Sequence, residues 1–199
     1  MIAAMDELAP GLWRWTARHP EAEDDPVPGS PADWPAEVGS VAYAVDDTLV
    51  LIDPLVPDEL WPALDELARG RNVIVLTTIG WHRRSRDEVV LRFDASTSRA
   101  RGNLPSNVVP LPLRRAGETM FWLPDVRTLV PGDRLLGGEN GGVRVCPDSW
   151  LRYLTSGLSG AELRVLLQPL LDLPIERVLT SHGEPVLSSG REALAKALS

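Results

Sequence analysis

A pattern that occurs twice in the same order constrains this chain more than any other feature. Thr48-Leu-Val-Leu-Ile-Asp53 is followed by Val75-Leu-Thr-Thr-Ile-Gly80, and Thr128-Leu-Val-Pro-Gly-Asp133 is followed by Val178-Leu-Thr-Ser-His-Gly183. Each half therefore has one apolar strand that ends in aspartate and a second that ends in a small-residue loop. Two such βα halves suggest two sheets that pack face to face, with the helices outside them.

The length of 199 residues fits one domain or two closely packed halves. We expect a single domain over residues 1–199, with halves at about 38–110 and 111–199. Residues 1–37 are expected to hold a strand at 12–18 and then an irregular loop that is rich in proline and acidic residues.

Hydrophobic periodicity and turn residues predict the other elements. The expected strands are 41–45, 48–52, 72–77, 108–113, 119–123, 127–130 and 177–179. The expected helices are 57–69, 85–93, 149–156, 159–171 and 190–198, and residues 137–142 are expected to form a flexible glycine-rich loop. Ser159 and Glu162 have the spacing of a capping box at a helix start.

Charge and composition restrict the possible partners. A net charge of −8 argues against nonspecific binding to nucleic acid or to anionic membranes, because both need a basic surface. Cys146 is the only cysteine, so neither a disulfide framework nor a cysteine zinc cluster is expected. The first residues lack the features of a secretory signal, and no run approaches the roughly 20 apolar residues of a membrane helix. We therefore expect a cytoplasmic protein.

Aspartate and histidine follow several of the predicted strands. Asp53 and Asp133 each end one strand, while His82 and His182 lie in the loops at 78–84 and 180–183. The doubled pattern would bring all four loops to one edge of the sheets, where α/β proteins place their sites. Such side chains are rare at the ends of buried strands unless they are solvated, hydrogen-bonded or metal-bound.

These residues resemble motifs of the metallo-β-lactamase superfamily over about residues 38–198. Val50-Leu-Ile-Asp53-Pro resembles the motif whose aspartate orients the metal-ligand loop. Leu129-Val-Pro-Gly-Asp133 resembles the Gly-Asp motif that supplies a metal-bridging carboxylate, and Leu179-Thr-Ser-His182-Gly resembles the motif that supplies a late histidine ligand. The resemblance implies a four-layer αββα sandwich, a site for one or two ions of zinc or sometimes iron, and commonly hydrolysis.

The chain departs from the central signature of that superfamily. His-x-His-x-Asp-His falls on Thr78-Ile-Gly80-Trp-His82-Arg83, so its three histidines are missing and its aspartate is His82. A further family histidine would fall near Arg114, where there is none. Threonine is a poor zinc ligand and glycine has no side chain. Arg83 is expected to oppose a dication, so we expect the first metal position to be absent.

The second metal position has a candidate ligand set. His82, Asp133 and His182 offer two imidazoles and one carboxylate, which suit one zinc or iron ion. Asp53 or Glu118 would then act as a base or would orient the ligands. The protein would in that case be a metal-dependent hydrolase that acts on an ester, amide or thioester. The alternative is that the two histidines are hydrogen-bonded loop residues in a fold that holds no metal.

Arginines cluster near the same predicted edge. They are Arg83, Arg84, Arg86, Arg114 and Arg115. One hypothesis is a metal-free, noncatalytic relative whose cleft binds a small anionic molecule or a protein partner, with Arg83, Arg84, Arg114 and Trp81 in contact with it. The competing hypothesis is a set of surface salt bridges, since the chain has 28 acidic residues. The oligomeric state is open.

Overall fold

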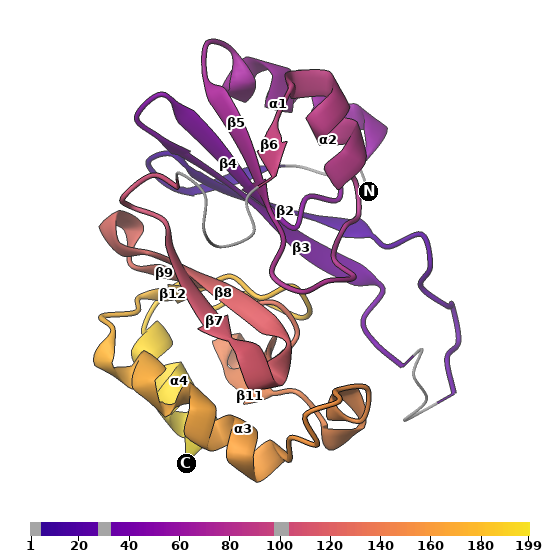
Figure 1. The fold of residues 1–199 in the computed structure, drawn as a ribbon, viewed down its shortest axis with the longest axis vertical. Helices are drawn as coiled ribbons and strands as arrows, with labels where there is room; N and C mark the ends of the chain where they lie inside the picture. The colour runs from indigo at the N-terminus through magenta and orange to yellow at the C-terminus, as the bar shows by residue number, and fades with distance from the viewer. Residues whose placement is uncertain (1–4, 28–32, 98–103) are drawn as a thin grey trace.

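Two β-sheets lie face to face between two pairs of helices in the computed structural model, which describes residues 5–27, 33–97 and 104–199 (Figure 1). The first sheet follows chain order: β1 (Asp6–Ala9), β2 (Leu12–Arg18), β3 (Glu37–Val45), β4 (Thr48–Ile52), β5 (Asn72–Leu76) and β6 (Ser96–Thr97). The second has the order β12 (Arg177–Val178), β9 (Thr128–Val130), β8 (Glu118–Leu123) and β7 (Val109–Leu113). The predicted four-layer αββα sandwich is confirmed.

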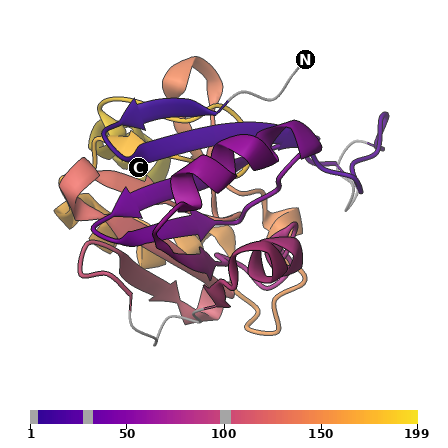
Figure 2. The same ribbon diagram turned by 90° about the horizontal axis from the view of Figure 1, so that it is seen from above.

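One pair of helices covers the outer face of each sheet. The helices α1 (Trp61–Ala68) and α2 (Arg86–Phe93) lie on the first sheet, in front of its strands in Figure 2. The helices α3 (Gly160–Leu167) and α4 (Gly190–Leu198) pack on the second sheet, at the bottom of Figure 1. Each outer layer thus has its own hydrophobic core beneath it, separate from the core between the sheets.

The strand β4 shows why the sequence forms this sandwich. All five of its residues are buried, because one face meets the helices and the other meets the second sheet. Leu49 and Leu51 pack in the core beneath α1 and α2, whereas Val50 and Ile52 pack in the core between the sheets. Side chains alternate along a strand, so a strand that is buried on both faces has an uninterrupted apolar run.

The doubled sequence pattern corresponds to a doubled strand pairing. In the first half, β4 pairs in parallel with β5, and in the second half β9 pairs in parallel with β12. Asp53 follows β4 and Asp133 lies three residues beyond the end of β9, while the two histidine loops follow β5 and β12. Parallel strands end at the same edge of a sheet, so each half brings its aspartate and its histidine loop together there.

Several segments differ from the sequence predictions. The loop predicted at 137–142 connects two short strands that the sequence does not predict, the antiparallel hairpin of β10 (Leu135–Gly137) and β11 (Val143–Val145). A β-carbon on Gly137 would lie 2.2 Å from the carbonyl oxygen of Glu184, so the hairpin packs too closely for any larger residue. The helix expected at 149–156 is only one short 3-10 turn, η5 (Asp148–Leu151).

Further 3-10 turns extend or connect the main elements. They are η1 (Asp58–Leu60), η2 (Arg114–Ala116), η3 (Pro124–Val126), η4 (Glu139–Gly141) and η6 (Gln168–Asp172). η1 forms the start of the helix predicted at 57–69, and η6 forms the end of the helix predicted at 159–171. A proline at the start of α1 and another at the start of η6 mark the points where the 3-10 and α-helical segments meet.

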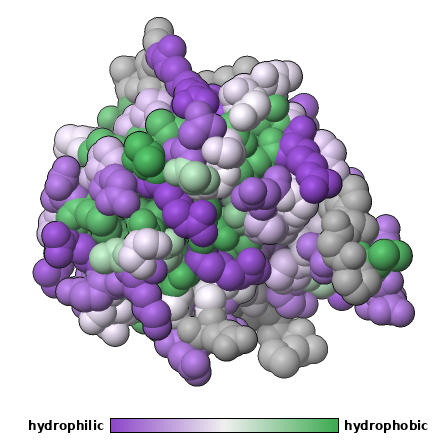
Figure 3. Space-filling view, turned by 90° about the horizontal axis from the view of Figure 1, so that it is seen from below, coloured by the Kyte–Doolittle hydropathy of each residue, from purple (hydrophilic) through white to green (hydrophobic). Residues whose placement is uncertain are grey.

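The outer surface of the second half is mixed in polarity. Seen from the side of α3 and α4, hydrophobic residues are interleaved with hydrophilic ones (Figure 3). Among the residues that the structure describes, no helix has the length and hydropathy needed to cross a bilayer.

Candidate metal centre

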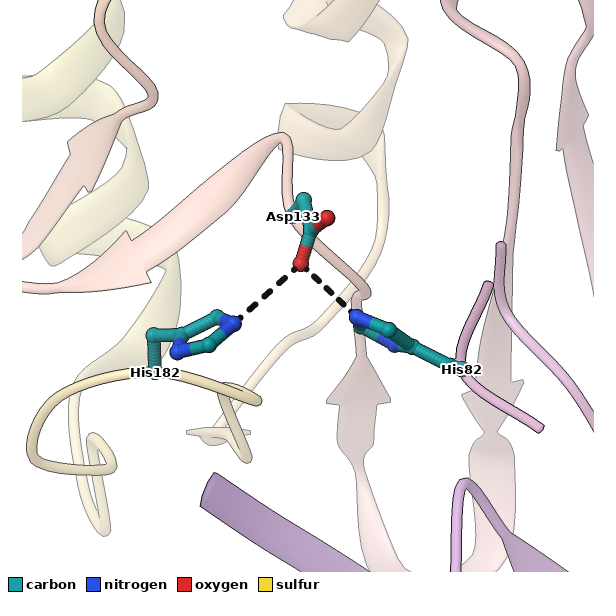
Figure 4. A group of neighbouring side chains, drawn as sticks. All are labelled: His82, Asp133 and His182. Atoms are coloured by element: carbon teal, nitrogen blue, oxygen red, sulfur yellow. Dashed lines mark ion pairs between the residues drawn. The ribbon is translucent and has the colours of Figure 1, made fainter. Parts of the chain in front are cut away.

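Three side chains from three different loops converge at the shared edge of the sheets. His82 Nε2 lies 3.0 Å from Asp133 Oδ1, and His182 Nε2 lies 3.5 Å from the same oxygen (Figure 4). One ligand atom from each residue lies within 4.8 Å of the other two, and all three residues are buried. The structure therefore brings together the three residues that the sequence predicts as metal ligands.

Other groups hold the opposite side of each candidate ligand. His82 Nδ1 lies 2.8 Å from Asp53 Oδ2, and the Trp81 indole N–H donates to Asp133 Oδ2 over 2.9 Å. His182 Nδ1 lies 3.4 Å from the carbonyl oxygen of Pro35. Both imidazoles are thus turned so that Nε2 faces the shared space, which is how outer contacts orient metal ligands in proteins.

Backbone geometry at the ends of the strands fixes these side chains. Asp53 has a left-handed φ of 47°, which an aspartate tolerates better than most residues, and its Oδ1 accepts the Thr78 N–H over 2.8 Å. The His182 loop is held at both sides, because Gly39 N–H donates to the Ser181 carbonyl over 2.7 Å and Gly137 N–H donates to the His182 carbonyl over 2.8 Å.

The Asp133 loop is held by a buried carboxylate. Glu118 accepts hydrogen bonds from the backbone N–H groups of Gly132, Asp133 and Arg134 over 2.8 to 3.0 Å. A β-carbon on Gly132 would lie only 2.6 Å from the Thr78 hydroxyl oxygen, so glycine is needed for this close approach. The glycine of the Leu129-Val-Pro-Gly-Asp133 motif is thus explained by packing against the first half of the chain.

The residues fit a cation at this place. Asp133 Oδ1 is buried and, despite its short distances to both imidazoles, accepts no hydrogen bond with acceptable geometry within the described part of the chain. A buried carboxylate oxygen without a hydrogen bond is costly, and a metal ion would satisfy it. Two imidazoles and one carboxylate are a known zinc and ferrous iron donor set that leaves positions open for water or substrate.

His82 lies between two carboxylates, those of Asp53 and Asp133. Burial disfavours the imidazolium, but the carboxylates of Asp53 and Asp133 outweigh it and raise the pKa of His82 to about 9. Burial likewise opposes the charge of Asp133, yet His82 and His182 hold the pKa of that carboxyl well below its usual range. A proton on His82 therefore occupies the place where a metal would bind, and binding must release it.

The residues expected at the first metal position of the superfamily, Thr78 and Gly80, carry no imidazole. The Thr78 hydroxyl bonds to Asp53 Oδ2, and Gly80 has no side chain to offer. The sequence suggests that Arg83 opposes a metal, but its exposed guanidinium turns away and pairs with Asp87 over 3.2 Å. In residues 5–27, 33–97 and 104–199, His82, Asp133 and His182 are the one group of at least three potential ligands that converge.

Asp53 and Glu118 have the contacts of orienting residues. Asp53 contacts His82 and Thr78, whereas both oxygens of Glu118 are occupied by backbone amides. Burial and the neighbouring Asp133 raise the pKa of Glu118 to about 7. The structure places neither carboxylate in the wall of the pocket that contains the candidate metal ligands. Their alternative role as a base stays a prediction.

A pocket of about 610 Å³ opens over the three ligands. Its wall includes Trp81, as the sequence predicts, and further residues that the sequence patterns do not indicate: His19, Trp34, Arg134, Trp150 and Tyr153. His182 makes edge contacts with Trp34 and Trp150, whose rings lie 5.6 and 5.5 Å away. Burial and the nearby Arg84 lower the pKa of His19, which lies 5.2 Å from Trp34, ring to ring.

The arginines do not form the single cleft that the sequence suggests. Arg84 is the one member of the predicted set that borders the pocket over His82, Asp133 and His182, whereas Arg83, Arg86 and Arg114 line a different pocket. Arg115 pairs with Glu162 over 2.8 Å at the surface. Arg83 and Arg84 are neighbours in the sequence, yet their side chains lie on opposite sides of the loop after β5. The sequence alone does not show this separation.

Comparison with known proteins supports the fold but not a close relationship. No family model matches the chain, and no curated protein matches its sequence. Among solved structures, VMB-1 is 14% identical, with a TM-score of 0.61 over 99% of this chain and 98% of that one. A metallo-β-lactamase from Hirschia baltica is 12% identical, with a TM-score of 0.58 over 98% and 96%.

A third similar structure contains a single metal. The NDM_FIM-1-like metallo-β-lactamase from Erythrobacter litoralis, described in its mono-zinc form, is 14% identical. Its TM-score is 0.60 over 98% of this chain and 94% of that one. The chain therefore has the metallo-β-lactamase fold over nearly its whole length, as the sequence resemblance implies.

Proposed function

We propose that this protein is a metal-dependent hydrolase that uses one metal ion, held by His82, Asp133 and His182. The observation that carries the proposal is the convergence of three buried ligand atoms: the Nε2 atoms of His82 and His182 face Asp133 Oδ1, and all three lie within 4.8 Å of one another. Zinc and ferrous iron are the metals whose ligand preferences this set meets. That a structure with the same fold exists in a mono-zinc form supports the single-metal assignment.

A metal bound there would polarise a carbonyl and lower the pKa of a bound water towards about 7, as hydrolysis of an ester, amide or thioester requires. The protein's own residues prepare the site. Asp53 holds His82 by its Nδ1, and Trp81 holds the second oxygen of Asp133. Trp34, Trp81 and Trp150 give the pocket an aromatic wall beside the candidate ligands.

The metal-free alternative receives less support at this pocket. Among the arginines predicted from sequence, Arg84 is the one that borders it, but its guanidinium donates to the carbonyls of Gly39 and Asp53 and to Ser181 Oγ over 2.6 to 2.8 Å. Three of the five N–H groups of Arg84 are thus directed at protein acceptors from both halves of the chain. We therefore assign Arg84 a structural role rather than the ligand-binding role predicted from sequence.

Metal analysis tests the proposal. Untagged protein should contain about one equivalent of zinc or iron, because a buried donor set of this type binds such ions tightly. His182→Ala should lose most of that metal, and a chelator should lower the melting temperature of the wild type but not of the variant.

His19→Ala is the matched control. His19 is a histidine in the wall of the same pocket, but it does not belong to the converging group, so this variant should keep its metal. The proposal is wrong if the purified wild type neither contains nor binds zinc or iron, or if His182→Ala retains the full equivalent.

A further inference from the structure

A second pocket lies on the other side of the loop after β5. It has a volume of about 500 Å³ and shares no lining residue with the pocket over the candidate metal ligands. Its walls come from the end of β5, from β6 and from the start of β8. The backbone closes its floor, because Thr119 N–H donates to the Thr78 carbonyl over 2.8 Å and Ile79 pairs with Glu118 in an isolated bridge.

Positive charge exceeds negative charge around this pocket. Arg83, Arg86 and Arg114 line it, and the exposed carboxylate of Asp87 is divided between the first two at 3.2 and 3.1 Å. Arg114 has no ion-pair partner among the described residues, and its side chain is exposed at the rim. Glu118 is the acid in the wall, but backbone amides of the Asp133 loop already occupy its oxygens.

Hydroxyl groups supplement the guanidiniums. Thr77, Thr97 and Thr119 all line the same pocket as the three arginines, so the pocket includes neutral hydrogen-bonding side chains as well as cations. Guanidinium forks combined with hydroxyls suit an anion with three outward oxygens, which is the geometry of a phosphate group. The volume of the pocket leaves space for the remainder of a small molecule that carries such a group.

We propose that this second pocket binds the phosphate group of a small phosphorylated molecule, through Arg86, Arg114 and the neighbouring threonine hydroxyls. None of its lining residues is a candidate metal ligand, so the two sites can be altered by separate substitutions. Thr78 and Glu118 connect the two, since they line the second pocket and also bond to Asp53 and to the Asp133 loop.

Calorimetric titration of the whole protein tests this site. Inorganic phosphate and sulfate are the probes, and succinate represents carboxylates, all at low ionic strength so that charge pairing is not screened. Phosphate should bind in the millimolar range or tighter, with sulfate similar and succinate weaker. Arg114→Gln and Arg86→Gln should each weaken phosphate binding about tenfold, as the loss of a charge-assisted hydrogen bond predicts.

Two control variants distinguish this pocket from general surface charge and from the metal centre. Arg144→Gln removes an exposed arginine of β11 outside the pocket and should not change phosphate affinity. His182→Ala removes a candidate metal ligand and should also leave the phosphate affinity unchanged. The phosphate titration and the metal analysis can therefore fail independently of each other. Absence of binding, preference for succinate, or phosphate binding that survives both pocket variants would overturn the proposal. Loss of binding in His182→Ala alone would place the phosphate at the metal centre instead.

Discussion

Each candidate metal ligand uses one polar atom to contact the protein and presents another to its neighbours. Asp133 shows this most clearly, since Trp81 occupies Oδ2 and leaves Oδ1 facing His82 and His182. Trp81 is 57% exposed, so it is not a residue of the hydrophobic core. Its hydrogen bond to Asp133 instead suggests that it positions this candidate ligand. Outer contacts of this type typically contribute 10- to 100-fold to metal affinity.

Replacing Trp81 by phenylalanine tests that role. Trp81→Phe keeps an aromatic ring in the pocket wall but removes the donor to Asp133 Oδ2, so metal affinity should fall by about tenfold or more. Competition with a chromophoric chelator measures it. Trp150→Phe is the control, because Trp150 packs against His182 without a hydrogen bond to any candidate ligand. Equal affinities for the two variants would contradict the assigned role.

The raised pKa of His82 predicts how the metal-free protein responds to pH. A histidine whose pKa rises on folding stabilises the folded state fully below its unfolded pKa of about 6.5 and loses this contribution as the pH rises through about 9. In chelator, the difference in unfolding free energy between wild type and His82→Gln should therefore shrink from pH 6.5 to 9. Denaturant titrations measure it, and a difference that grows with pH would refute the ion pairing.

The ligand residues can be predicted from the sequence better than the pocket around them. His82, Asp133 and His182 are identifiable because each follows a predicted strand and the doubled pattern places the strand ends together. Trp150 and Tyr153, by contrast, lie in or just after a short 3-10 turn that has no strong sequence signal. His19 precedes Pro20 in an irregular segment, so its place over the site depends on long-range packing that local patterns do not encode.

At the level of elements, local signals predict most boundaries. The helix α3 begins as its capping box predicts: Ser159 Oγ accepts the Glu162 N–H over 3.3 Å, and the Glu162 carboxylate accepts the Ser159 N–H over 3.0 Å. The hairpin of β10 and β11 escapes sequence-based prediction because each strand has only three residues, too few to show a period. Its stability comes instead from packing of Leu135 and Leu136 in the core beneath α3 and α4.

Two N-cap serines allow a matched test of the capping box. Ser159→Ala should lower the free energy of unfolding by about 1 kcal/mol, because it removes the side-chain acceptor at the start of α3. Ser189 precedes α4 without a side-chain cap hydrogen bond, so Ser189→Ala should change the free energy of unfolding by only about 0.2–0.3 kcal/mol. Chemical denaturation compares them, and equal losses would show that the capping bond contributes nothing.

At the level of the whole molecule, one half-buried arginine connects the two halves. Arg84 has a left-handed φ of 40°, and its guanidinium bonds to Gly39 and Asp53 of the first half and to Ser181 of the second. Burial lowers the pKa of Arg84, which Asp53 and Asp133 partly oppose. The contact with Ser181 lies directly before His182, so the arginine positions the candidate ligand that comes from the second half.

Removing this connection should affect both stability and metal binding. Arg84→Met leaves the two carbonyls without their donor and should lower the free energy of unfolding by on the order of 2–4 kcal/mol, while metal affinity also falls. Arg83→Met, one residue earlier on an exposed side chain, should change stability by less than about 0.5 kcal/mol. Paired denaturation and metal-binding measurements test this, and similar results for both variants would contradict it.

The single-metal centre is tested most directly by anomalous diffraction at the zinc absorption edge from crystals of the protein grown with zinc. We expect one strong peak at about 2.0–2.2 Å from His82 Nε2, His182 Nε2 and an oxygen of Asp133. The same experiment on His182→Ala should show that peak greatly weakened. A zinc peak elsewhere in the molecule, or no peak within reach of these three side chains, would contradict a metal centre at this place.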